Sequence, residues 1–306
     1  MADLNRRSIL ALAGSTVMAS AFSKALAAAP GSYPPGIQLY AVRDPLATDA
    51  PRTLRKLHEI GYLEVETAGF GKYTAKDYRG FCDDVNLKIP SAHLGFQDAT
   101  DFGPLFADAN TLGAQYATSS VLFTQATQPS AGQAKPTAPT APPPIGLDGF
   151  KKIAARMNDI GTKAKAAGLQ YAYHNHNHEF EKMPDGSYGY DVLLRETDPG
   201  LVKFEIDCGW MVIGGADPVH YFKQYPGRFR MLHVKDFKTR TVTTLRVGPA
   251  RPQGAELGHG FIDYHPIFAA AHAAGIEHAF AEQEGPYVQP QLESAEVSYK
   301  YLKSLA

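Results

Sequence analysis

The sequence predicts an α/β protein built as a single (β/α)8 TIM barrel. A unit in which a helical stretch ends in Gly and a short apolar strand follows at once recurs along the chain after residue 36. Eight such strands lie between residues 36 and 283, a length that suits one closed barrel. No Gly-x-Gly-x-x-Gly motif follows the first strand, so a dinucleotide-binding fold lacks its main fingerprint.

Strands and helices alternate regularly, which predicts a parallel sheet with the helices outside it. The expected strands are residues 36–42, 63–69, 89–95, 115–121, 169–175, 202–209, 228–235 and 277–283. The helices before five of these strands end in Gly61, Gly113, Gly168, Gly227 and Gly275. Gly just past a helix end adopts the left-handed conformation that stops the helix.

Composition and charge indicate a soluble globular protein. Apolar residues make up 44% of the 306 residues, and 30 basic residues against 31 acidic residues leave a net charge of −1. Because nothing in this balance attracts a polyanion, we expect no nucleic-acid partner. Cys82 and Cys208 are too few for a disulfide framework, so we expect two free, buried thiols.

Residues 1–29 read as a twin-arginine export signal, with Arg6 and Arg7 before an apolar stretch of small residues and Ala-x-Ala sites near its end. The stretch is too short and too rich in Ala, Gly and Ser to be a good membrane span. We therefore expect a periplasmic or secreted protein whose mature form, residues 30–306, has no membrane span.

A Pro/Ala-rich stretch at about 126–145 predicts a loop after the fourth strand, which either covers the active site or is a solvated insertion.

Polar side chains gather at the carboxyl ends of the expected strands, where the chemistry of a parallel barrel takes place. They are Glu66, His93, His174, Asn175, His176, His178, Glu179, Glu205, Asp207, His233, Lys235, Asp236, Glu282 and Glu284. Carboxylates converging on the barrel axis repel one another unless a proton or a cation intervenes. A mixed carboxylate and imidazole set suits one divalent metal, namely Mn, Co, Zn or Fe, with Mg possible.

Alternation along the strands selects among these groups. Glu205 and Asp207 share one side of their strand, and Asp207, nearer the rim, is the better metal ligand. Glu205 is then a partner in a second layer, or a member of a buried ion pair with Lys203 or Arg230. His233 is the candidate ligand of the next strand, and Glu282 is preferred to Glu284 because it follows directly on an apolar run.

The remaining polar groups are candidates for proton transfer and substrate contact. The acid or base candidates are Lys235, His176, Glu66, His93 and Glu284. Three of them also have purely structural alternatives. Lys235 could form a surface ion pair with Asp236 or Glu284, Glu66 could pair with Arg43, and His93 could be a hydrogen-bonded core imidazole. Contacts to substrate are expected from His174, Trp210 and Glu284, with Trp210 serving either as a platform for a sugar face or as packing under the rim.

These pieces together resemble the sugar phosphate isomerase/epimerase family with the xylose isomerase-like barrel. The resemblance covers roughly residues 36–305 and is carried by GIQLYAVRD, GYLEVETAGF, YHNHNHEF, EIDCGW followed by GADPV, HVKDF, ELGHGFID and AEQE. In that family Glu, Asp, His and Glu from strands five to eight hold one metal. The resemblance implies Asp207, His233 and Glu282 here, with Glu179 as the ligand from strand five and His174 or His176 as its substitute.

The resemblance implies chemistry on a sugar or keto-sugar through an enediolate intermediate. Reprotonation of that intermediate gives an isomerase or epimerase, whereas loss of a β-substituent gives a lyase or hydratase that cleaves 3-keto-glycosides. The latter would work beside an oxidoreductase in the same pathway. A non-catalytic sugar-binding protein is a remote alternative, and the sequence leaves the oligomeric state open, a homo-oligomer included. Because the expected location is outside the cytoplasm and no Gly-rich phosphate cradle is visible, a phosphorylated sugar is disfavoured.

Overall fold

The computed structural model describes residues 33–122, 144–244 and 252–305. The predicted export signal at residues 1–29 lies outside the described residues, as does almost all of the predicted loop at 126–145. The two assignments therefore stay predictions.

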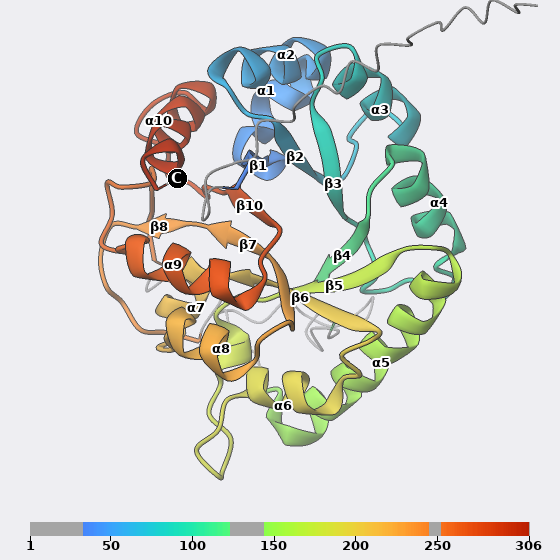
Figure 1. Cartoon of the computed structure of the whole chain (residues 1–306), viewed down its shortest axis with the longest axis vertical. Helices are drawn as coiled ribbons and strands as arrows, with labels where there is room; N and C mark the ends of the chain where they lie inside the picture. The colour runs from blue at the N-terminus through green and yellow to red at the C-terminus, as the bar shows by residue number, and fades with distance from the viewer. Residues whose placement is uncertain (1–32, 123–143, 245–251, 306) are drawn as a thin grey trace, which may run out of the picture.

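Eight parallel strands close into a barrel, with helices arranged around it (Figure 1). The barrel strands are β1 (Pro35–Gln38), β2 (Glu64–Ala68), β3 (Lys88–His93), β4 (Tyr116–Ser120), β5 (Gln170–His174), β6 (Val202–Asp207), β7 (Phe229–Val234) and β10 (His278–Ala281). Neighbouring strands in the closed order β1-β10-β7-β6-β5-β4-β3-β2 all pair in parallel. The predicted fold class and all eight predicted strands are confirmed.

The helices lie outside the barrel and follow the predicted alternation. They are α1 (Arg43–Thr48), α2 (Ala50–Ile60), α3 (Ala75–Asp83), α4 (Gly103–Leu112), α5 (Gly146–Ala166), α6 (Gly189–Glu196), α7 (Cys208–Ile213), α8 (Pro218–Gln224), α9 (His265–Ala274) and α10 (Gln291–Ser304). Two 3-10 turns, η1 (Leu39–Val42) and η2 (His178–Phe180), lie among them. None of the described helices is long and apolar enough to cross a membrane.

Helix α2 shows how the sequence sets these boundaries. The Asp49 side chain accepts a hydrogen bond from the Arg52 backbone N–H, and Pro51 occupies the first turn, where its missing N–H costs nothing. Leu54 and Leu57 face the core, and the helix ends at Gly61, whose φ is 121°. The other four predicted stop glycines also have positive φ, as the sequence predicts.

All eight strands end one to four residues earlier than predicted, and one small sheet was not predicted. β1 stops at Gln38, since residues 39–42 form η1. β6 stops at Asp207 because its side chain caps α7. Beyond β7, β8 (Asp236–Phe237) pairs antiparallel with β9 (Gly254–Ala255), a pair of strands too short for their patterns to predict.

An apolar layer fills the barrel interior below the strand ends. Tyr116, Ala172, Met231 and Phe280 form this layer and are at most 2% exposed. On the side of this layer that faces the carboxyl ends of the strands, the ring of His233 lies 6.0 Å from the Phe280 ring. Because this layer blocks the interior, the polar groups above it are accessible only from the carboxyl ends of the strands.

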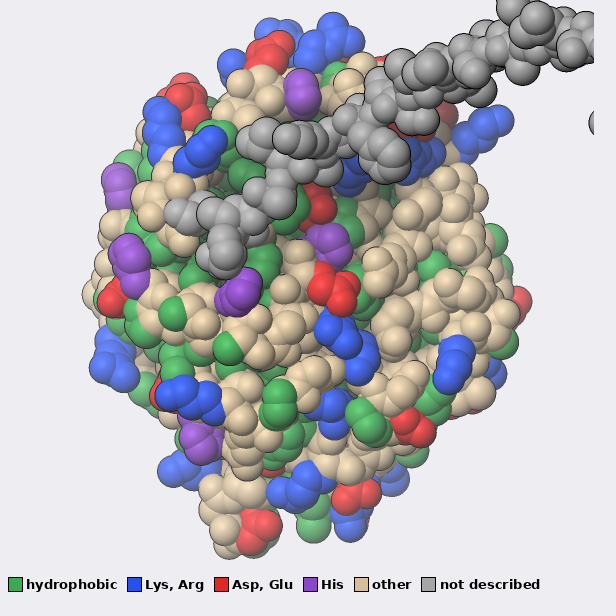
Figure 2. Space-filling model, viewed as in Figure 1, with side chains coloured by type: hydrophobic (Ala, Val, Ile, Leu, Met, Phe, Trp, Pro, Cys, Tyr) green, Lys and Arg blue, Asp and Glu red, His purple; other side chains and the backbone are tan. Residues whose placement is uncertain are grey.

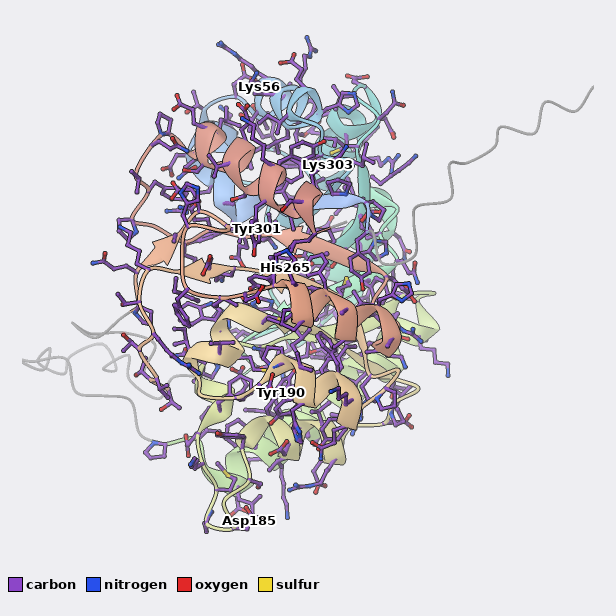
Figure 3. All side chains as sticks on the ribbon, turned by 60° about the vertical axis from the view of Figure 1, so that its left-hand side comes forward. Lys56, Asp185, Tyr190, His265, Tyr301 and Lys303 are labelled. Carbon is purple, nitrogen blue, oxygen red and sulfur yellow. The ribbon has the colours of Figure 1, made fainter. Side chains whose placement is uncertain are left out.

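On the face of the molecule that Figure 2 shows, neither acidic nor basic side chains predominate. Figure 2 shows acidic and basic side chains interspersed over the face in view, in keeping with the near-zero net charge. Figure 3 shows Asp185 at the outer end of the loop that leads from η2 to α6, whereas Tyr190 on α6 is fully buried. Cys82 and Cys208 are free and buried, as predicted.

Candidate metal centre

The register of the strands brings four potential ligands together above the apolar layer. Asp207 lies beside His233 on the neighbouring strand, and His233 lies beside Phe280, two residues before Glu282. His174 ends β5 on the other side of β6. One ligand atom from each of His174, Asp207, His233 and Glu282 lies within 4.8 Å of the others, and all four side chains are buried. We call these four residues the metal group.

Asp207 provides the observation that best fits a cation. Its Oδ1 accepts a hydrogen bond from the Trp210 N–H at 2.7 Å, which orients the carboxylate. Its Oδ2 is fully buried and, among the described residues, meets no donor at hydrogen-bonding geometry, although the Lys235 ammonium forms an ion pair with it at 3.1 Å. Burial raises the pKa of Asp207 more strongly than Lys235 and the nearby imidazoles lower it. A divalent cation would satisfy this oxygen, and two imidazoles with two carboxylates are a donor set that Mn, Fe, Co and Zn accept.

His233 and Glu282 are in direct contact. His233 Nδ1 lies 2.8 Å from Glu282 Oε2. Burial opposes ionisation of Glu282, but the adjacent Lys235 and His233 hold the pKa of that carboxyl well below its usual range. Glu282 is therefore an anion that can share a cation with Asp207.

Lys235 is the resident positive charge of the site. It is 1% exposed, and its Nζ lies 3.1 Å from Asp207 Oδ2, 2.9 Å from Glu282 Oε2 and 2.8 Å from Glu284 Oε1. Burial disfavours the ammonium form, but the three carboxylates outweigh it and raise the pKa of Lys235 well above its usual value. The predicted pair between Lys235 and Glu284 is thus present, buried beside the metal group rather than on the surface.

Trp210 packs beside this lysine. The Lys235 Nζ lies 5.1 Å from the centroid of the Trp210 ring, and the indole N–H donates to Glu284 Oε1 at 3.2 Å. The ring is 3% exposed and also approaches His176, with ring centroids 6.0 Å apart. Of the two predicted roles, packing under the rim fits this burial, and the indole orients Glu284.

A second layer of carboxylates lies beneath the metal group. Glu66 and Glu205 are fully buried. Glu205 Oε2 lies 2.7 Å from His93 Nε2 and 3.1 Å from His174 Nδ1, while Glu66 Oε2 lies 2.7 Å from His233 Nε2. The predicted second-layer role of Glu205 agrees with these contacts.

His93 and Glu205 stabilise each other's charged forms. Burial disfavours protonation of His93, but Glu66 and Glu205 outweigh it and raise the pKa of His93 to about 10.

The alternative pairing of Glu66 with Arg43 is not found, because Arg43 lies against Tyr40 and Tyr287 instead.

Glu179 lies outside the metal group, which changes the expected ligand from strand five. Its carboxylate accepts hydrogen bonds from the Tyr173 hydroxyl at 2.7 Å and the His176 N–H at 2.8 Å, and lies 2.9 Å from His178 Nε2. Glu179 thus belongs to a separate group with His176 and His178. Because η2 begins after β5 has ended, it turns Glu179 away, and His174 is the residue of β5 that reaches Asp207, His233 and Glu282.

Three supporting residues were not assigned this role from the sequence. Gln38 donates to Glu66 Oε2 at 2.8 Å, and the Ser91 hydroxyl donates to Glu66 Oε1. Asn175 bonds the backbone of Asp207 through both its side-chain oxygen and its nitrogen. Polar side chains at inward positions of apolar strands were the signal available for Gln38 and Ser91, but the alternation alone does not name their partner.

A closed (β/α)8 barrel with a group of potential metal ligands at its strand ends is the class of protein that the fold and the site define. The chain belongs to the xylose isomerase-like TIM barrel family, whose model matches residues 54–305. The family resemblance of the sequence is therefore confirmed.

Relatives with named activities match different shares of the chain. An inosose dehydratase from Mesomycoplasma hyopneumoniae is 26% identical over 275 residues, which cover 83% of this chain and 88% of that protein. An inosose dehydratase from Lacticaseibacillus casei is 28% identical over 168 residues, 51% of this chain, and the match spans only about half (54%) of that relative's length. A sugar phosphate isomerase/epimerase from Parabacteroides distasonis, solved by crystallography, is 27% identical with a TM-score of 0.67, covering 90% of this chain and 94% of that one.

Proposed function

We propose that this chain is a divalent-metal-dependent lyase that eliminates a β-substituent from a keto-sugar or a 3-keto-glycoside. The observation that carries the proposal is the Lys235–Glu284 pair beside the metal group, with Nζ and Oε1 2.8 Å apart. Relatives named inosose dehydratases support it, since a dehydratase removes water by elimination.

The metal would be held by His174, Asp207, His233 and Glu282. A divalent cation there supplies a Lewis acid for a substrate carbonyl and stabilises negative charge that develops on its oxygen. We propose Mn, Co, Zn or Fe as the ion on the strength of the mixed nitrogen and oxygen donors, with Mg possible.

Elimination needs a base for the proton beside the carbonyl and an acid for the departing oxygen. Glu284, whose side chain is 14% exposed, accepts the carbon-bound proton. Lys235 Nζ carries a proton and gives it to the departing oxygen as the carbon–oxygen bond breaks. The hydrogen bond between Nζ and Oε1 then returns the proton from Glu284 to Lys235, so that the pair is restored after each turnover.

An isomerase or epimerase is the second candidate, and the Parabacteroides relative favours it. The same base would then return its proton to the substrate, and the departing oxygen would stay in place. His176, half-buried next to Trp210, is the candidate for the second proton-transfer group that epimerisation needs. A non-catalytic sugar-binding role has no such use for a buried lysine among three carboxylates.

The proposal extends to location and context. The twin arginine at Arg6 and Arg7 supports a periplasmic or secreted enzyme that takes unphosphorylated sugars. A keto-glycoside has to be made by oxidation of a glycoside, so an oxidoreductase is the proposed partner in the pathway.

The test is to incubate metal-loaded protein in deuterated water with a 3-keto-glucoside, with an inosose and with a free ketose. Release of the aglycone or of water, detected by mass spectrometry and lost after treatment with a chelator, is the expected result. Deuterium incorporation into the free ketose without elimination from either other substrate would establish the isomerase or epimerase instead.

A further inference from the structure

The two imidazoles of the metal group each contact two carboxylate layers. One ring nitrogen of each faces Asp207 or Glu282 above, and the other faces Glu205 or Glu66 below. The two residues differ, however, in which nitrogen faces which layer.

His174 directs its Nε2 upward. Its Nε2 lies 3.9 Å from Asp207 Oδ2, a separation that leaves room for an ion between the two atoms. Its Nδ1 lies 3.1 Å from Glu205 Oε2, at hydrogen-bond distance. Glu205 therefore accepts the Nδ1 proton and leaves Nε2 as the ligand atom.

His233 has the opposite orientation. Its Nδ1 lies 2.8 Å from Glu282 Oε2, whereas its Nε2 lies 2.7 Å from Glu66 Oε2 and 3.2 Å from Glu205 Oε2. The lower carboxylates accept the Nε2 proton, which leaves Nδ1 as the ligand atom.

We propose that Glu205 and Glu66 are positioning residues that fix the ligand atoms as Nε2 of His174 and Nδ1 of His233. A carboxylate that accepts the second N–H of a metal-binding imidazole sets its tautomer and makes its free nitrogen a better donor. This inference rests on the metal group of the proposed function but on no particular reaction.

Both carboxylates are themselves held in place. Gln38 and Ser91 donate hydrogen bonds to Glu66, one to each carboxylate oxygen. Glu205 is held by His93, whose Nε2 lies 2.7 Å from Oε2. Glu66 and Glu205 lie beneath the metal group, so neither is placed to touch a substrate that enters from the strand ends.

A deeper cation between these carboxylates is the competing arrangement. The nitrogens of His93, His174 and His233 and an oxygen of Glu205 do lie within 4.8 Å of one another. An ion there would take the nitrogens that the proposal assigns as proton donors. The two arrangements therefore predict opposite ligand atoms, which a measurement can distinguish.

The experiment uses the full chain labelled with 15N-histidine and loaded with 113Cd²⁺ in place of the natural metal. Scalar coupling between cadmium and nitrogen is expected at one Nε2 and one Nδ1, with about one equivalent of cadmium bound. Substitutions His174→Gln and His233→Gln assign the two signals. Coupling to Nδ1 of His174 and Nε2 of His233 would overturn the inference while leaving a metal site in the barrel. Failure to bind cadmium, manganese or zinc at all would overturn the metal group and this inference with it.

Variants test the positioning role without relying on activity. Glu205→Gln and Glu66→Gln should each weaken metal binding by roughly 10–100-fold, the usual effect of losing such a partner. The matched control is Glu64→Gln, because Glu64 also accepts from an imidazole, His278, with Nδ1 and Oε2 2.7 Å apart, but belongs to no described metal-ligating group. Circular dichroism establishes that each variant folds. Native affinity in folded Glu205→Gln and Glu66→Gln would refute the proposal, and the cadmium spectrum of the unaltered protein decides the case if either variant does not fold.

Discussion

Asp207 has two roles, as a helix cap and as a potential metal ligand, and a pair of substitutions distinguishes them. Its Oδ1 caps α7 by accepting the Trp210 N–H, and its Oδ2 faces the metal group. Asp207→Asn keeps a side-chain oxygen for the cap but removes the negative charge, whereas Asp207→Ala removes both. We expect Asp207→Asn to fold normally and to bind metal poorly.

The expected magnitudes follow from these contacts. Asn caps helices about as well as Asp, while Ala at such a position costs about 1 kcal/mol of stability. Loss of a ligand should weaken metal binding by at least about 100-fold, the upper end of the effect of losing a mere supporting partner. At a metal concentration 100 times the native dissociation constant, bound metal stabilises the native protein by about 2.7 kcal/mol, but the variant by only about 0.4 kcal/mol.

Thermal unfolding with and without metal measures this difference, together with metal content by elemental analysis. Metal should raise the native midpoint by roughly 5 °C or more and that of Asp207→Asn by about 1 °C. The control is Asp217→Ala, because Asp217 caps α8 through the Val219 N–H at 2.9 Å and belongs to no described metal-ligating group. It should lose about 1 kcal/mol of stability and keep its metal response. If Asp207→Asn retains a full equivalent of metal at native affinity, the assignment of Asp207 as a ligand is refuted.

Three further predictions follow. Lys235→Met should keep the metal and lose about 100-fold or more in turnover, measured by product release, because it removes the proton donor; unchanged turnover would remove Lys235 from the mechanism. The metal-free protein should resist urea better at pH 7 than at pH 10, because the pKa of His93 is raised from about 6.5 in the unfolded chain to about 10 in the folded protein. The stabilisation that a raised pKa provides is complete below the pKa of the unfolded chain and is lost as the pH rises through the pKa of the folded protein. His93→Gln should flatten that dependence, and an equally steep profile in the variant would contradict the attribution. Gly209→Ala should cost roughly 1–3 kcal/mol of stability in urea unfolding, because its Cβ would lie 2.5 Å from the Lys235 backbone oxygen; native stability would show that this contact relaxes freely.

Much of the fold was predictable because it depends on local patterns. The helix-stopping glycines and the short apolar strands recur in order, and a closed barrel is the arrangement that buries all of them. Strand alternation also placed Asp207 and His233 on the inside of the barrel, where the structure has them next to each other.

The ligand from strand five could not be read in the same way. Alternation predicts orientation only while the strand lasts, and β5 ends at His174. Beyond it the chain turns into η2, so the direction of Glu179 is set by tertiary contacts with Tyr173 and His178. Lys235 was predicted as a site residue, but its contacts with Asp207 and Glu282 were not, since a flexible four-carbon side chain can take several directions from its strand.

The central claim is that one divalent metal lies among His174, Asp207, His233 and Glu282. A crystal of the metal-loaded protein, measured at and below the absorption edge of the metal, locates the ion directly by anomalous scattering. The account predicts one strong peak within about 2.0–2.3 Å of His174 Nε2, Asp207 Oδ2, His233 Nδ1 and a carboxylate oxygen of Glu282. A peak beside Glu179, His176 and His178, or no peak anywhere in the barrel, would contradict it.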